Sequence, residues 1–110
     1  MKHLSRKFST LMLASLALAS TCAHAIPSGK DMSIWIDVGG PVGGPYATVI
    51  QNGAKQAAED LDANLRVVYS DWQPQKMIEN FKQAVSADPS GIIIMGHPGD
   101  SAYQPLIMEA

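Results

Sequence analysis

Four residues of this sequence have side chains suited to holding a small polar ligand: Tyr46, Trp72, His97 and Asp100. Tyr46 and Trp72 are aromatic, and a flat aromatic face packs well against the C–H face of a sugar ring. His97 and Asp100 can hydrogen-bond the hydroxyl groups of such a ligand. Each of the four lies near the end of an apolar segment. We therefore predict that these residues form a ligand-binding site.

The sequence leaves a structural explanation open for three of these residues. Tyr46 could belong to the apolar stripe of a helix, formed with Ile50, Ala57, Leu61 and either Gly53 or Ala54. Trp72 could be a partly buried loop residue. His97, the only histidine after residue 25, could be structural rather than ligand-binding.

The glycine-rich stretch 39–45 does not match the known nucleotide-binding patterns. A dinucleotide fingerprint needs glycines at positions i, i+2 and i+5, and Pro41 stands at the second of these when Gly39 is the first. Asp71 does stand where an acid that reads a ribose is found, but a phosphate-binding Gly-Lys-Ser or Gly-Lys-Thr is absent. The glycines could also serve only a tight turn. We expect no cofactor.

Catalytic and metal-binding patterns are equally weak. A serine hydrolase of this fold class needs G-x-S-x-G on a sharp turn, and the sequence lacks it. His97 has no neighbouring cysteine and only scattered carboxylates, which is a poor set of metal ligands. We therefore expect a binding protein that holds no metal and has no catalytic residue among positions 26–110.

The elements that must position these residues alternate between strand and helix. Apolar runs at 34–38, 65–70 and 91–95 predict strands, and amphipathic patterns predict helices at about 45–62 and 74–87, with a third beginning at 101–103. We expect Pro105 in or near the first turn of the last helix. This order predicts an α/β fold, a doubly wound parallel sheet in the strand order 2-1-3. The 39–46 and 96–100 loops would then face each other at the switch point.

Residues 1–25 have the pattern of a secretory signal peptide. A basic start precedes the apolar run 11–19, and Ala23-His24-Ala25 is a small-x-small cleavage site. The apolar run is shorter than the roughly 20 residues that a membrane span requires. Cys22 could instead carry a lipid, but Ala19-Ser20-Thr21 before it matches a lipoprotein signal poorly. We expect cleavage after Ala25, export to the periplasm, and one lobe formed by residues 26–110.

The charge of the exported part argues against two classes of partner. From residue 26 onward the chain has five basic residues and ten acidic ones, a net charge near −5. Such a chain is repelled by nucleic acids and by anionic membrane surfaces. It also has no cysteine after cleavage, so a disulfide or a thiolate metal site is excluded. We expect a monomer that binds a small molecule.

Two stretches resemble a known family. The first is a strand ending in Gly39-Gly40, followed by Gly44-Pro45-Tyr46 before a helix with paired alanines; the second is SADPSGIIIMGHPGDSAYQPLIMEA, residues 86–110. In this order they resemble the amino-terminal part of type I periplasmic solute-binding proteins, the ribose/galactose-binding branch that serves ABC importers of simple sugars. The resemblance covers residues 32–110.

The resemblance implies two α/β lobes, joined by hinge strands, that close on a sugar or a similar polar molecule and dock on an ABC transporter permease. By position, Tyr46 corresponds to an aromatic residue that lines the cleft, and His97 and Asp100 fall in a loop that borders it. The family's strongest ligand-binding acid and arginine come from beyond the third helix. We therefore expect this sequence to be part of an incomplete first lobe.

Two alternatives remain at this stage. The first is an exported α/β enzyme, a hydrolase or a cofactor-dependent one, with its catalytic residues outside this segment. The second is a signalling receiver domain, which has a similar doubly wound order. A receiver needs an acceptor aspartate at the end of its third strand, where this chain has Gly96-His97. This chain also has the pattern of an export signal, which a receiver does not carry.

Overall fold

The computed structural model describes residues 27–110. The predicted signal peptide and Cys22 lie outside these residues. The described elements alternate along the chain in the predicted order. They are β1 (Ser33–Asp37), α1 (Pro45–Leu61), β2 (Asn64–Val68), α2 (Pro74–Ser86), β3 (Gly91–Ile93) and α3 (Asp100–Glu109).

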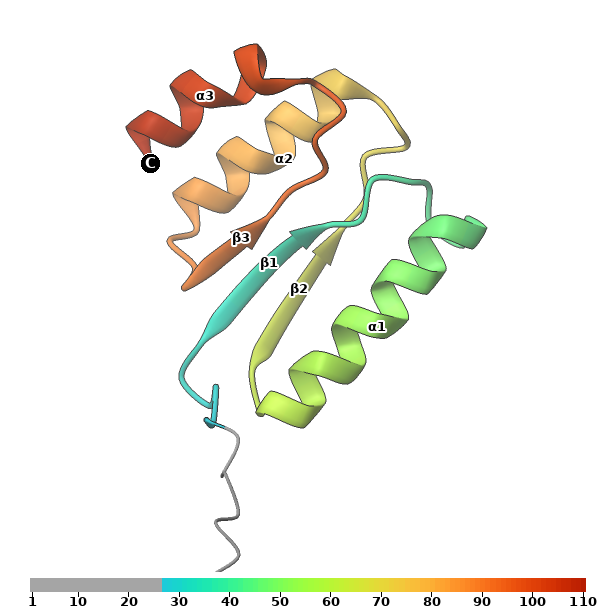
Figure 1. Ribbon diagram of the computed structural model, residues 1–110, viewed down its shortest axis with the longest axis vertical. Helices are drawn as coiled ribbons and strands as arrows, with labels where there is room; N and C mark the ends of the chain where they lie inside the picture. The colour runs from blue at the N-terminus through green and yellow to red at the C-terminus, as the bar shows by residue number, and fades with distance from the viewer. Residues whose placement is uncertain (1–26) are drawn as a thin grey trace, which may run out of the picture.

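The three strands form one parallel sheet in the order β2-β1-β3. Trp35 of the central strand is opposite Arg66 of β2 and Ile92 of β3. Helix α1 lies on one side of the sheet, and α2 and α3 lie together on the other (Figure 1). The predicted α/β class, the parallel pairing and the strand order are all confirmed.

Helix α1 packs on one face of the sheet through small residues. Pro45 is its first residue, a position where the missing N–H costs nothing, and Asp62 ends it in the left-handed conformation. Ala47 is fully buried against Ile36 and Val38, and Ile50 and Ala54 extend this contact. The predicted stripe is therefore partly wrong, since Tyr46, Ala57 and Leu61 are exposed.

Helix α2 packs on the opposite face with the predicted apolar stripe. Met77, Phe81 and Ala84 are buried, and Ile78 and Val85 pack beside them. Tyr103 of α3 meets Phe81 edge to face, with ring centroids 5.6 Å apart. Aromatic pairs in this geometry contribute about 0.5–1.5 kcal/mol beyond the area they bury. This contact fixes α3 to α2 rather than directly to a strand.

Helix α3 begins one residue earlier than the predicted range, at Asp100. Pro105 consequently lies inside the helix rather than in or near its first turn, and this prediction was wrong. A proline at that position removes one hydrogen bond to the preceding turn. None of the described helices is long and apolar enough to span a membrane.

All three strands end before the predicted positions. β1 ends at Asp37, β2 at Val68 and β3 at Ile93, against predicted ends at 38, 70 and 95. The residues that follow, 38–40, 69–70 and 94–95, belong to the loops at the carboxyl edge of the sheet. These loops carry the candidate site.

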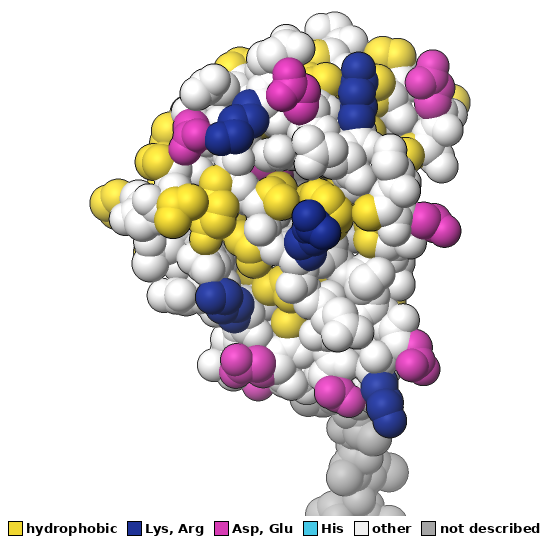
Figure 2. Space-filling view, turned by 180° about the vertical axis from the view of Figure 1, so that it is seen from behind, with side chains coloured by type: hydrophobic (Ala, Val, Ile, Leu, Met, Phe, Trp, Pro, Cys, Tyr) yellow, Lys and Arg dark blue, Asp and Glu magenta, His cyan; other side chains and the backbone are white. Residues whose placement is uncertain are grey.

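The face seen in Figure 2 shows hydrophobic side chains gathered across its middle, with most charged side chains around them.

Candidate functional site

Three aromatic rings, from the first turn of α1 and from the loops after β2 and β3, meet at the carboxyl end of the sheet. The ring centroid of Trp72 is 5.1 Å from that of Tyr46 and 5.2 Å from that of His97, with interplanar angles of 55° and 47°. All three side chains are exposed; 48% of Tyr46 and 40% of Trp72 is accessible to solvent. We call Tyr46, Trp72 and His97 the aromatic cluster.

The exposure of Tyr46 excludes it from the buried stripe of α1, whereas Trp72, at 40% exposed, matches the alternative of a partly buried loop residue. Tyr46 lies in the first turn of α1, outside the buried stripe that begins at Ala47. Trp72 lies in the loop between β2 and α2, with its ring between the other two.

Trp72 has an unusual backbone conformation. Both Asp71 and Trp72 have positive φ, 51° and 59°, and Gln73 donates its N–H to the Ser70 carbonyl at 2.9 Å to close the turn. Two positive φ values at the centre of a turn are adopted mainly by glycine, asparagine and aspartate, so Asp71 suits its position and Trp72 does not. A non-glycine residue held in this region costs on the order of 1 kcal/mol or more. The surrounding structure must offset this cost.

Two glycines provide the surface against which Trp72 packs. A side chain at Gly39 would come within 3.0 Å of the Trp72 ring, and one at Gly40 within 3.1 Å. Gly39 also has a φ of +83°, which favours glycine. The glycine-rich stretch thus makes a tight turn and allows the ring of Trp72 to approach the backbone closely.

A buried carboxylate lies beneath this loop. Asp37 Oδ1 accepts hydrogen bonds from the Gly39 N–H and from Ser70 Oγ, both at 2.8 Å, and Oδ2 accepts one from Asn80 Nδ2 at 2.9 Å. Asp37, Ser70 and Asn80 are all buried. Burying a charge is costly unless hydrogen bonds compensate, and here three donors do so. We call Asp37, Gly39, Ser70 and Asn80 the carboxylate network.

The carboxylate network is joined to the aromatic cluster through one residue, Gly39. The Gly39 carbonyl accepts a hydrogen bond from the Trp72 N–H at 2.8 Å, and Ser70 Oγ is 2.9 Å from the same carbonyl oxygen. Asn80 Nδ2 also donates to the Tyr69 carbonyl at 3.2 Å. The backbone from Tyr69 to Trp72 is therefore held by groups from the loops after β1 and β2 and from α2.

Tyr103 extends the polar region under the site. Its hydroxyl is buried and makes no hydrogen bond to any residue that the structure describes. Burial raises the pKa of the Tyr103 hydroxyl, and the negative charge of Asp37 raises it further. The phenol is thus held in its neutral form to higher pH than in water.

The fourth predicted residue, Asp100, lies apart from the aromatic cluster. It is the first residue of α3, where its charge interacts favourably with the helix dipole. It lines a hollow of about 460 Å³ together with Ile94, Gly96, Gly99, Tyr103, Gln104, Ile107 and Met108. The rings of the aromatic cluster do not line this hollow, so the structure joins three of the four predicted residues.

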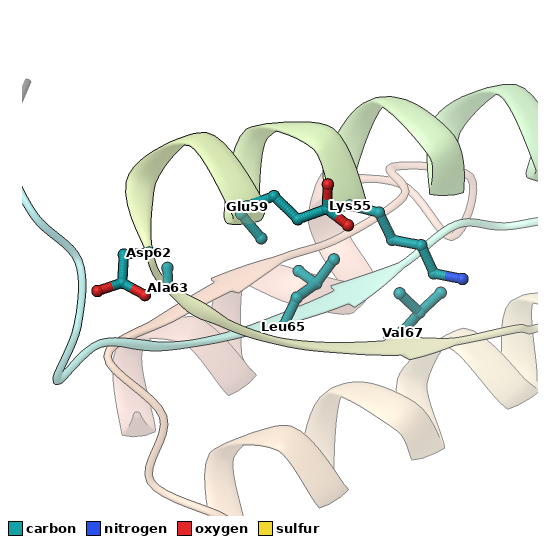
Figure 3. Close-up of a pocket in the computed structure, with 7 residues that line it drawn as sticks. Lys55, Glu59, Asp62, Ala63, Leu65 and Val67 are labelled. Carbon is teal, nitrogen blue, oxygen red and sulfur yellow. The ribbon is translucent and has the colours of Figure 1, made fainter.

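A second hollow lies between α1 and β2, with a volume of about 550 Å³. It is lined by Leu65 and Val67 of the edge strand and by charged residues of α1 and its end, including Lys55, Glu59 and Asp62 (Figure 3). It contains no aromatic residue. It does not include any of the predicted site residues.

The sequence reasoning missed Asp37, Ser70 and Asn80. A signal for Asp37 was present, because an acid at the end of a strand that is buried on both faces must have partners. Asn80 stands within the apolar stripe of α2, between Met77 and Phe81. A polar residue at a position expected to be buried indicates a buried hydrogen-bond network. Which of these polar residues bond to one another is known only from the tertiary structure.

Comparison with known proteins gave no match to a family model, to a curated protein or to a solved structure. The argument for function therefore depends on the site itself. Within residues 27–110 no group of three or more His, Cys, Asp and Glu side chains is placed to hold a metal ion.

Proposed function

We propose that this chain forms part of the first lobe of an exported solute-binding protein that delivers a simple sugar, or a similar polar molecule, to an ABC importer. The observation that carries the proposal is the aromatic cluster at the carboxyl end of the sheet. Ligands of open α/β sheets bind at this end, beside the switch point in strand order. Here the switch point lies between β1 and β3.

The chemistry of the aromatic cluster favours a sugar over other small molecules. Tyr46 and Trp72 offer apolar ring faces, and the tilted arrangement leaves both partly open to solvent. The imidazole of His97 adds a polar group beside them. A molecule with a C–H face and a rim of hydroxyls matches this combination of surfaces.

Binding can be tested on this chain by titrating the protein with pentoses and hexoses and following the indole N–H resonance of Trp72 by NMR. Because one lobe covers only one side of a ligand, we expect weak but saturable shifts, with a dissociation constant on the order of millimolar. Amino acids of similar size are the control and should give no saturable shift. Saturation by an amino acid, and by none of the sugars, would contradict the proposed ligand class.

Export and the importer partner are part of the same proposal. The basic start, the apolar run and the Ala-His-Ala site support cleavage after Ala25 and release into the periplasm. Amino-terminal sequencing of the exported product should give Ile26 as the first residue. A product that begins with a lipid-modified Cys22 would instead indicate a membrane-anchored lipoprotein.

A further inference from the structure

We propose that Asp37 is a positioning residue for the aromatic cluster: through Gly39, which bonds to Asp37 by its N–H and to Trp72 by its carbonyl, the carboxylate fixes the backbone that carries Trp72. Two hydrogen bonds make the connection. The Gly39 N–H donates to Asp37 Oδ1 at 2.8 Å, and the Gly39 carbonyl accepts from the Trp72 N–H at 2.8 Å. The inference rests on the proposed binding role of the cluster, but its test requires no ligand.

The anchor of this connection is rigid. Asp37 ends the central strand, which is paired on both sides, and only 5% of the residue is exposed. Its pairing partner in β2 is Val68. Side chains two residues apart in a strand point to the same face, so Ser70 reaches the carboxylate from the continuation of β2. Helix α2 brings Asn80 to the other carboxylate oxygen.

The group that is held has a conformation it would not adopt alone. Trp72 follows Asp71 with a second positive φ, in a turn whose sequence contains no glycine. Such a conformation persists only where the surroundings determine it. The described contacts that do so include the hydrogen bond to the Gly39 carbonyl, the packing of the ring on Gly39 and Gly40, the Gln73–Ser70 hydrogen bond that closes the turn, and the ion pair of Lys76 with Asp71. The first two of these contacts depend on where Gly39 lies, and Asp37 and Ser70 set that position.

The competing explanation is that the carboxylate network only stabilises the fold. A purely structural network would change the free energy of unfolding when altered, but it would leave Trp72 in the same environment in the folded protein. A positioning network would change the environment of Trp72 while the rest of the core stays the same. The two tryptophans of the chain, Trp35 and Trp72, separate these cases. Trp35 is buried on the same strand as Asp37 and reports on the core.

The test is ¹⁹F NMR of the protein labelled with 5-fluorotryptophan, which gives one resonance for each tryptophan; Trp72→Phe assigns them. The variant is Asp37→Asn, which keeps the shape of the side chain but replaces one acceptor oxygen with a donor. That amide must face either the Asn80 amide or the Gly39 N–H, and both are donors. We expect the Trp72 resonance to shift or broaden by exchange and the Trp35 resonance to keep its position.

Two serine variants complete the design. Ser70→Ala removes one donor from Asp37 without adding a conflict, and we expect a smaller change of the Trp72 resonance in the same direction. Ser90→Ala, at the opposite end of the sheet, is the matched control and should change neither resonance. If Asp37→Asn does not fold, Ser70→Ala decides alone. A Trp72 resonance that is unchanged, or that moves only together with that of Trp35, would overturn the positioning role.

Discussion

The two ends of the parallel sheet both use short polar side chains to hold the backbone, but with different surroundings. At the amino end, the Ser33 N–H donates to Ser90 Oγ at 3.1 Å and the Ser90 N–H donates to Ser33 Oγ at 3.3 Å. Both serines are exposed. At the carboxyl end, Asp37 and Ser70 are buried and hold a loop that carries an exposed tryptophan.

This difference shows that similar polar contacts contribute unequally to stability at the two ends of one sheet. The amino-end pair joins β1 to the start of β3 in water, where each hydrogen bond replaces one to solvent and contributes little. The carboxyl-end network lies where water cannot replace a lost partner, so each of its bonds is costly to break. The buried network is what allows the aromatic rings above it to be held in a fixed arrangement while exposed.

The strongest test of this comparison is Asp37→Ala. The change removes the buried acceptor that the Gly39 N–H, the Ser70 hydroxyl and the Asn80 amide share, and leaves only the carbonyls of Gly39 and Tyr69 for the hydroxyl and the amide. We expect the free energy of unfolding to fall by about 3 kcal/mol or more. Urea unfolding followed by circular dichroism measures it. Ser33→Ala, at the amino end, is the control, and an equal loss in the two variants would remove the distinction between the ends.

A matched pair of identical substitutions sharpens the comparison. Ser70→Ala removes a buried hydroxyl that bonds to a carboxylate, and we expect a loss of about 1–2 kcal/mol in unfolding free energy. Ser90→Ala removes an exposed hydroxyl, and we expect a change within about 0.5 kcal/mol. The same urea experiment measures both. A larger loss for Ser90→Ala than for Ser70→Ala would contradict our account of the carboxyl end.

The aromatic cluster should affect binding rather than folding. If this protein binds a sugar as proposed, Tyr46→Ala should weaken the free energy of binding by about 1 kcal/mol, because an aromatic packing surface is lost. Since Tyr46 is half-exposed, the unfolding transition should change little. Calorimetric titration beside urea unfolding measures both quantities. Val49→Ala, an exposed residue on the same helix outside the cluster, should leave affinity unchanged. Unaltered affinity in Tyr46→Ala would remove that ring from the site.

The smallest expected effect comes from Tyr103. Its hydroxyl has no hydrogen-bond partner among the described residues, so Tyr103→Phe should change stability at neutral pH by less than about 1 kcal/mol. Burial and the Asp37 charge raise the pKa of Tyr103 in the folded state, so the folded protein holds this proton more tightly than the unfolded chain.

The sign of the pH dependence follows from this difference. The contribution of Tyr103 is fully present below the unfolded pKa of about 10 and is lost as the pH rises through the higher folded value. Around that unfolded pKa, between about pH 9 and about pH 11, the free energy of unfolding should therefore fall less steeply with pH in Tyr103→Phe than in the parent protein. Urea unfolding at each pH measures the two slopes. Equal slopes would show that the phenol is not held neutral by its surroundings.

The sequence alone was sufficient for the fold class, the element order and the strand order. The short β-branched run Ile92–Ile94 indicates a strand by its length and composition, and the stripe of Met77, Phe81 and Ala84 has the period of a helix. It was also sufficient to select Tyr46, Trp72 and His97, because residues that follow parallel strands must gather at one edge of the sheet. The details at helix ends, including the place of Pro105, depend on local caps and were less well determined.

Only the tertiary structure decided which of these residues act together. The strand order 2-1-3 puts the loops after β2 and β3 on the two sides of the loop after β1, yet the central ring is Trp72, from the loop after β2. Its ring packs over Gly39 and Gly40 of the loop after β1, where it meets both Tyr46 and His97. Asp37, Ser70 and Asn80 are up to 43 residues apart in the chain, and no local pattern links them. A buried charge fixes its partners only when three elements have packed, because low polarity and excluded water then make every missing hydrogen bond costly.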